Sequence, residues 1–151
     1  MTVVEALQRA PLFKDFGEAG IRTLAEIVRE RQLPAGSPLF VEDAVGESLF
    51  VVVEGSVRLT QRGAGGEREL ATVGPFEALG ELGLLARTVR LVTAVAATDC
   101  TVLELGRREF FRKAQEKPIT CLKLAAVVAG ELAQRVAENR DALRGLAGRK
   151  A

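Results

Sequence analysis

Residues 48–74 read SLFVVVEGSVRLTQRGAGGERELATVG, and this stretch decides the fold that we expect. Short runs rich in β-branched residues alternate here with glycines. Val57 and Leu59 are separated by a polar residue, which is the period-two pattern of a strand with one buried face. The glycine-rich segment at residues 63–66 and the run that follows it predict a β-hairpin.

Similar runs lie on both sides of this hairpin. PLFVED precedes it, VRLVTAVA and CTVLELG follow it, and the runs are separated by Gly46, Gly55 and Gly74. Closely spaced short strands with such punctuation are typical of an antiparallel sandwich or barrel. We therefore expect an antiparallel β region over residues 35–105.

Helical patterns flank this region. In residues 16–33, FGEAGIRTLAEIVRERQL, apolar residues recur three and four positions apart, and Pro34 ends the pattern. After the β region, RREFFRKAQE predicts a short helix and residues 119–148 a long one. The sequence thus predicts an α+β chain with one domain, made of N-terminal helices over 1–34, the β region over 35–105 and C-terminal helices over 106–151.

The long C-terminal helix carries an apolar seam. Its members are spaced by threes, fours and sevens: Ala125, Val128, Leu132, Val136, Leu143 and Leu146. Such a seam packs either against a second copy of the chain or back on its own β region. We favour the first alternative, a homodimer through this helix.

The composition argues against several classes of function. The chain has 151 residues, of which 48% are hydrophobic and 27% charged, as in an ordinary globular domain. It contains no histidine, and Cys100 and Cys121 form no CxxC pair, so we expect no metal site and no Ser-His or Cys-His nucleophile. No apolar run is long enough to cross a membrane, and the N-terminus lacks the features of a secretory signal. We expect a cytoplasmic binding protein that is not an enzyme and has no cofactor.

Charge is distributed unevenly along the chain. Residues 1–105 hold 10 Lys/Arg against 15 Asp/Glu, whereas residues 106–151 hold 11 against 5. A basic C-terminal part without interleaved aromatic residues is weak evidence for nucleic-acid binding. We interpret these basic side chains as the solvent face of the C-terminal helices.

One stretch interrupts the β pattern. Residues 76–86, FEALGELGLLA, are rich in helix formers and predict a short helix that begins near Gly80, whose free backbone N–H groups would suit an anion. Arg90, at the start of the next strand, can donate to two phosphate oxygens, and Glu81 can accept from a sugar hydroxyl. These residues therefore fit either a phosphate-and-sugar site or a structural Glu81–Arg90 ion pair. Arg87 fits a surface position at the end of the helix.

Several ordered motifs carry a resemblance to a known family. LPAGSPLF resembles a PxGxxxF entry strand, VEDAVGESLFVVVEGSVRL the strand pair that follows it, and GELGLL the head of a phosphate-binding cassette. Arg90 follows Glu81 by nine residues, where the phosphate arginine of that cassette falls. Over residues 10 to 145 the chain thus resembles the cyclic-nucleotide-binding domains of catabolite-activator-type regulators and kinase regulatory subunits. The resemblance implies an antiparallel β-roll of the jelly-roll type, with a short helix in the cassette.

The resemblance also implies a ligand, cyclic AMP or cyclic GMP, and a role for each residue of the cassette. Gly80 and Gly83 would offer backbone amides to the phosphate, Glu81 would accept from the ribose 2′-hydroxyl, and Arg90 would bind the exocyclic oxygens. The C-terminal helix would serve as dimer contact and as lid over the base. The implied ligand-binding set is Gly80, Glu81, Leu82, Gly83, Arg90, Leu91 and Val92.

The chain departs from the family pattern at several positions. Leu91 and Val92 stand where the family has small residues, and Phe76 and Asp43 occupy turns where it has glycine. Because bulky residues after Arg90 take up ligand space, the alternative is a nucleotide-independent interaction or dimerisation domain of the same fold. The chain ends at Ala151, which leaves no room for a DNA-binding helix-turn-helix, so we expect a fragment or a module that signals through a protein effector.

Overall fold

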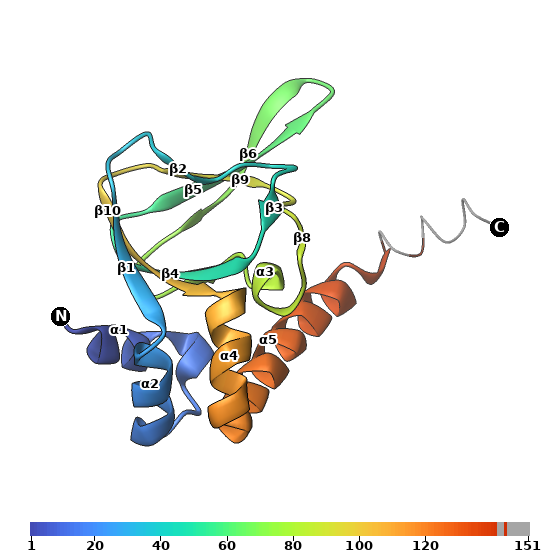
Figure 1. Cartoon of the computed structure of the whole chain (residues 1–151). Coiled ribbons are helices and arrows are strands. Elements are labelled where there is room, and N and C mark those ends of the chain that lie inside the picture. The colour runs from blue at the N-terminus through green and yellow to red at the C-terminus, as the bar shows by residue number, and fades with distance from the viewer. Residues whose placement is uncertain (142–143, 145–151) are drawn as a thin grey trace.

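The computed structural model describes residues 1–141 and 144, and Figure 1 shows helices gathered against one side of a β-roll. The N-terminal elements are α1 (Val3–Arg9), the 3-10 turn η1 (Pro11–Phe13) and α2 (Glu18–Ala25). Thr2 caps α1 by a capping box with Glu5. The predicted α+β architecture, an antiparallel β-roll flanked by helices, is confirmed.

The strands of the described chain pair antiparallel in two larger sheets and one small one. The first sheet has the order β1-β10-β4-β7, with bounds Val28–Leu33, Cys100–Gly106, Ser48–Glu54 and Ala78–Leu79. The second has the order β2-β9-β5-β6, with bounds Pro38–Phe40, Thr93–Ala96, Val57–Gly63 and Gly66–Val73. The third pairs β3 (Val45–Gly46) with β8 (Thr88–Val89).

The central strand β4 contributes to two buried clusters because its side chains alternate between two faces. Leu49 and Val51 pack against the helices, whereas Phe50 and Val52 pack between the two larger sheets. The predicted hairpin is the β5–β6 pair, which closes where Gly63 pairs with Gly66 and projects from the roll in Figure 1.

Two expected elements are wrong in part. Residues 28–33 continue no helix but form β1, which pairs with β10 from Val28↔Leu105 to Leu33↔Cys100. This long-range pairing overrides a local pattern that suits a helix. The expected strand over 89–96 is also broken, because Arg90–Val92 form a bend between β8 and β9 rather than the start of a strand.

The C-terminal helices are α4 (Arg107–Glu116), which has the predicted bounds, and α5 (Pro118–Glu138). Helix α5 buries Cys121, Leu124 and Val128 within its own domain. One residue of the predicted seam, Val128, therefore packs on its own chain and not on a second copy. The predicted seam residues Leu143 and Leu146 lie outside the described residues. Within the described part of the chain, no helix is both long and apolar enough to cross a membrane.

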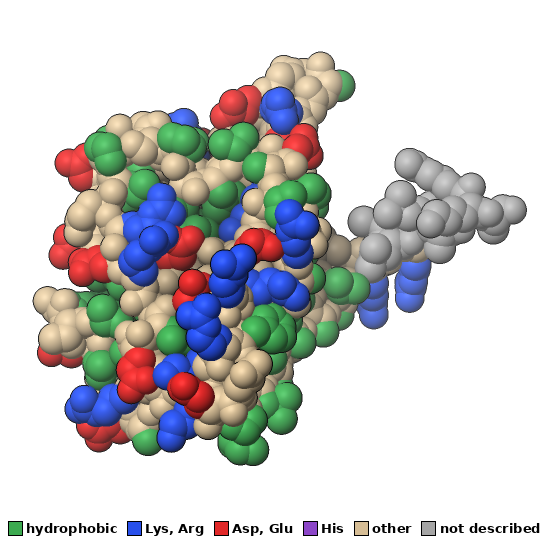
Figure 2. Space-filling model, viewed as in Figure 1, with side chains coloured by type: hydrophobic (Ala, Val, Ile, Leu, Met, Phe, Trp, Pro, Cys, Tyr) green, Lys and Arg blue, Asp and Glu red, His purple; other side chains and the backbone are tan. Residues whose placement is uncertain are grey.

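Most basic residues of the C-terminal part lie on the solvent face, as expected, but Lys113 is largely buried and pairs with Glu26 and Glu116. Arg108, Arg112, Lys117, Lys123 and Arg140 are exposed. Figure 2 shows basic and acidic side chains intermixed on the visible face of the domain, which agrees with a solvated surface.

Candidate functional site

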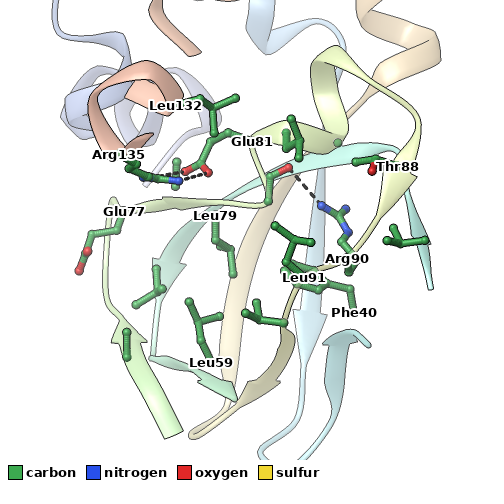
Figure 3. Close-up of a pocket in the computed structure, with 18 of the residues that line it drawn as sticks. Phe40, Leu59, Glu77, Leu79, Glu81, Thr88, Arg90, Leu91, Leu132 and Arg135 are labelled. Carbon is green, nitrogen blue, oxygen red and sulfur yellow. Dashed lines mark hydrogen bonds and ion pairs between the residues drawn. The ribbon is translucent and has the colours of Figure 1, made fainter. Parts of the chain in front are cut away.

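A cavity of about 730 Å³ lies between the β-roll and α5 (Figure 3). Strands β5 to β7 form one wall, the segment 80–92 a second, and the last turns of α5 a third. The structure brings all seven predicted site residues to this cavity: Gly80, Glu81, Leu82, Gly83, Arg90, Leu91 and Val92.

The segment around the short helix adopts a tight turn. Strand β7 ends at Leu79, Gly80 follows with φ +73°, and helix α3 spans Leu82–Leu85, two residues later than the predicted start. Gly80 needs this left-handed conformation, which a side chain would strain.

Two non-glycine residues stand in turns where the family pattern has glycine, and both have a positive φ. Asp43 has φ 72° and Phe76 has φ 69°, both in the left-handed region that non-glycine residues rarely adopt. The Phe76 N–H donates to the Val52 carbonyl at 2.7 Å, which holds the turn against β4. Both residues therefore hold a backbone conformation that glycine adopts at no steric cost.

Arg90 is a buried cation at the cavity wall. Its residue is 7% exposed, and its two terminal nitrogens donate to the carbonyls of Gly80 at 3.1 Å and Ser48 at 2.9 Å. Among the described residues, no carboxylate forms an ion pair with it, and its Nε is buried without a hydrogen-bond partner. Burial lowers the pKa of Arg90, although the charges of Glu104 and Glu81 oppose this shift. An uncompensated buried charge is costly unless an anion joins it.

Three glycines leave room for this side chain. A Cβ on Gly80 or Gly83 would lie 2.7 or 2.9 Å from Nη1 of Arg90, and a Cβ on Gly46 would overlap Nε. These positions therefore accept no larger residue while Arg90 keeps its place.

Gly46→Ala should lower the free energy of unfolding by about 1–3 kcal/mol, because the added methyl would overlap the side chain of the buried Arg90. Urea unfolding of the two chains measures the difference. Gly65→Ala is the matched control, since a Cβ there meets nothing within 4 Å. Equal stability of the Gly46 variant and the parent would show that Arg90 moves freely.

Glu81 lies on the opposite side of the cassette from Arg90. It is 4% exposed, and Arg135 of α5 donates to its two carboxylate oxygens at 3.2 and 3.4 Å (Figure 3). The hydrogen bond to Glu81 raises the pKa of Arg135, against the effect of burial. The alternative Glu81–Arg90 ion pair is thus not formed, and the partner is a residue that the sequence analysis missed. Its only signal was a basic residue beside the seam residue Val136.

The two bulky residues after Arg90 leave the cavity open. Leu91 is 64% exposed at the rim, and Val92 is half-buried in the lining. The carbonyl of Leu91 accepts a hydrogen bond from Gln61 at 3.1 Å, which fixes the bend. Arg87 is an exposed residue, as predicted, and pairs with Glu47 at 3.0 Å.

The rest of the cavity is mainly apolar. Beyond the cassette, the lining includes Leu59, Ala71, Val73, Leu79, Leu132 and Val136, with Thr72, Glu77, Arg135 and Asn139 as polar or charged members. The amide of Asn139 donates to the Arg135 carbonyl at 2.7 Å. The arrangement suits a molecule that has an anion at one end and a flat apolar group at the other.

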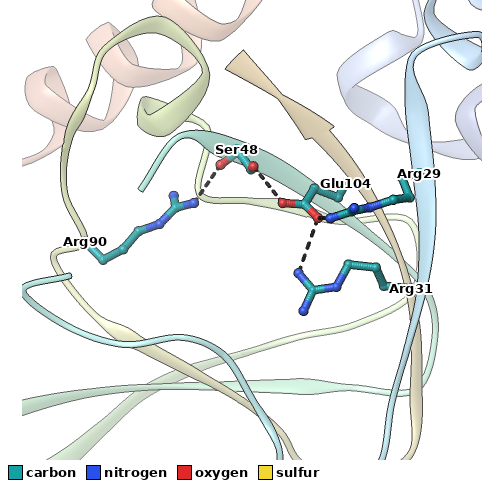
Figure 4. A network of polar contacts seen from close by, with 5 residues as sticks. All are labelled: Arg29, Arg31, Ser48, Arg90 and Glu104. Carbon is teal, nitrogen blue, oxygen red and sulfur yellow. Dashed lines mark hydrogen bonds and ion pairs between the residues drawn. The ribbon is translucent and has the colours of Figure 1, made fainter. Parts of the chain in front are cut away.

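Ser48 links Arg90 to a second charged cluster (Figure 4). Its carbonyl accepts from Arg90, and its hydroxyl donates to Glu104 at 2.7 Å. Arg29 and Arg31 donate to the other oxygen of Glu104 at 2.8 and 3.3 Å. Burial alone would raise the pKa of Glu104, but the hydrogen bonds from Arg29 and Ser48 and the neighbouring charges hold it below its usual value.

Comparison with known proteins agrees with this geometry. The family model described as cyclic nucleotide-binding domain matches residues 30–117. The cyclic AMP receptor protein of Thermus thermophilus is 33% identical over 127 residues, which cover 83% of this chain and 59% of that protein. The chain thus spans less than two thirds of this relative's length.

Solved structures show the same fold at similar identity. The N-terminal domain of a transcriptional regulator from Streptomyces coelicolor A3(2) has a TM-score of 0.76 and 32% identity, covering 91% of this chain and 94% of that one. The regulatory domain of Toxoplasma gondii PKA, crystallised with cAMP, has a TM-score of 0.66 and 31% identity, covering 73% of this chain and 42% of that one. Fold, cassette and sequence agree, and the chain belongs to the cyclic nucleotide-binding domain family.

Proposed function

We propose that the chain is a regulatory module, not an enzyme, that binds a cyclic mononucleotide in the cavity beside α3. The observation that carries the proposal is the guanidinium of Arg90, which is buried at the cavity wall without an acidic partner among the described residues. A cyclic phosphate would supply the missing negative charge and accept from the N–H groups that Arg90 leaves unused.

The remaining residues have places that suit the other parts of such a ligand. Gly80 and Gly83 bring backbone close to the phosphate position, and Glu81 offers free lone pairs to a ribose hydroxyl beside its contacts with Arg135. The apolar wall, with Leu132 and Val136 of α5, would enclose the base. Leu91 has no hydroxyl for the amino group of guanine, so we expect cyclic AMP to bind more tightly than cyclic GMP.

Relatives support this assignment by the ligands in their names. One is a cyclic AMP receptor protein, and another structure was determined as a complex with cAMP. We propose that the output runs through α5, since this helix lines the cavity and holds Glu81 through Arg135. Ligand would then shift the population of α5 arrangements and be read by a protein effector in the cytoplasm.

Isothermal titration calorimetry with cyclic AMP and cyclic GMP tests the proposal. We expect saturable binding of at least one of them and a rise in the melting temperature with ligand concentration. Absence of heat and of a thermal shift at millimolar ligand would leave the alternative, an interaction domain of this fold that works without nucleotide.

We also propose that the module forms a homodimer through α5, by a face other than the predicted seam, because Val128 of that seam is buried in the core of its own chain. Ile119 and Leu122 are 78% and 67% exposed on this helix, and they lie three residues apart on one face. Alanines at 126, 129 and 133 continue the same face at heptad spacing. The face would allow a close approach of two helices.

Leu122→Glu should convert a dimer into a monomer, because two buried carboxylates would face each other across the two-fold axis. Sedimentation velocity measures the mass of each form. Gln115→Glu, an exposed position on α4 with the same change of charge, should leave the mass unchanged. A monomeric parent chain would contradict the proposal.

A further inference from the structure

We propose that Phe40 is a positioning residue of the phosphate site: its ring supports the Arg90 guanidinium where an acidic residue would otherwise be needed. This inference rests on the proposed function for its effect on ligand. It concerns a residue outside the segment 80–92 and a contact that can be measured without nucleotide.

The geometry of the contact is that of a cation over an aromatic face. Cζ of Arg90 lies 4.3 Å from the ring centroid of Phe40 and 5.7 Å from that of Phe50. The two ring centroids lie 5.9 Å apart with an interplanar angle of 31°, so Phe50 lies beside Phe40 and borders the guanidinium as well. Both Phe40 and Arg90 belong to the cavity lining, and Figure 3 shows them next to each other.

The ring of Phe40 contacts a part of the Arg90 guanidinium that has no hydrogen-bond partner in the rest of the site. Carbonyls of Gly80 and Ser48 accept from the two ends of the guanidinium, but they are neutral and occupy the side of α3 and β4. The face of the guanidinium has no such partner. The negative face of a ring attracts a cation without forming a closed ion pair, so the positive charge stays available to an anion. A carboxylate at the same place would neutralise Arg90 and compete with phosphate.

A purely structural role for Phe40 makes a different prediction. If the ring only fills space between the sheets, any apolar side chain of similar size should serve, and ligand affinity should not depend on aromatic character. If the ring supports the cation, affinity should follow the strength of the aromatic face. Leucine keeps the apolar bulk but removes the aromatic face, whereas tyrosine keeps the aromatic face.

Calorimetry of the full chain with cyclic AMP separates these cases. Phe40→Leu should weaken binding by about 3- to 30-fold and Phe40→Tyr by less than about twofold, because tyrosine retains the cation–π contact. Phe110→Leu is the matched control, since Phe110 is buried among the helices and outside the cavity lining. Unchanged affinity of Phe40→Leu, or equal losses for leucine and tyrosine, would overturn the inference.

A second measurement keeps the inference testable if the parent chain binds no nucleotide. A double-mutant cycle of Phe40→Leu and Arg90→Met in urea unfolding, without ligand, measures their coupling directly. Phe40→Leu should lower the folding equilibrium constant in both backgrounds. We expect the factor by which it falls to be at least about three times larger in the parent than in the Arg90→Met variant. Additive effects would overturn the Phe40 inference even if nucleotide binds. Coupling without any nucleotide binding would instead overturn the proposed function alone.

Discussion

Arg90→Met should abolish cyclic-nucleotide binding while leaving the unliganded domain about as stable as the parent. Two charge-assisted hydrogen bonds to a desolvated phosphate would be lost, so affinity should fall more than about 100-fold. Stability should change by less than about 1 kcal/mol, because removal of a buried charge offsets the loss of the hydrogen bonds to Gly80 and Ser48. Most substitutions of a buried residue destabilise more than this.

The measurement is paired: calorimetry for the ligand and urea unfolding for the free chain. Arg87→Met is the matched control, because it removes the same charge three residues earlier from an exposed side chain. It should leave both affinity and stability unchanged. A large loss of stability in Arg90→Met would mean that the guanidinium is a structural element of the roll, and retained binding would mean that the phosphate sits elsewhere.

The sequence predicted the β-roll because its signals are local. Alternation in β5 and the glycines at its turn act within a few residues, and the structure has the hairpin there. The strand β1 was missed because VRERQL forms a strand only by pairing with β10, which lies more than 65 residues away in the sequence. No pattern within residues 28–33 encodes that partner.

Part of the candidate site could be predicted from the sequence, because those residues lie close together along the chain. The segment 80–92 is contiguous, and all seven of its predicted residues line the cavity. Arg135, however, reaches Glu81 across 54 residues of sequence, and Phe40 reaches Arg90 from the entry strand. Such contacts depend on how α5 and β2 pack on the cassette, which a single sequence does not specify.

Glu81→Gln should weaken the binding of cyclic AMP by about 10- to 100-fold, because a hydroxyl loses its charged acceptor. The loss should be confined to ligands that carry a 2′-hydroxyl. The carboxylate has about four lone-pair sites, and Arg135 uses one on each oxygen, so the hydroxyl finds a free site without displacing the helix. For 2′-deoxy cyclic AMP the substitution should therefore change affinity by less than about threefold.

The four affinities, two chains with two ligands, form a thermodynamic cycle that reads the Glu81–hydroxyl contact alone. Glu77→Gln serves as control: this carboxylate also borders the cavity, but it is exposed and accepts from the Gly74 N–H in a turn. Glu77→Gln should leave the ratio of the two ligands' affinities unchanged. Equal losses for cyclic AMP and its deoxy analogue on Glu81→Gln would show that Glu81 acts only through Arg135, by holding α5 over the cavity, and not as an acceptor for the ribose.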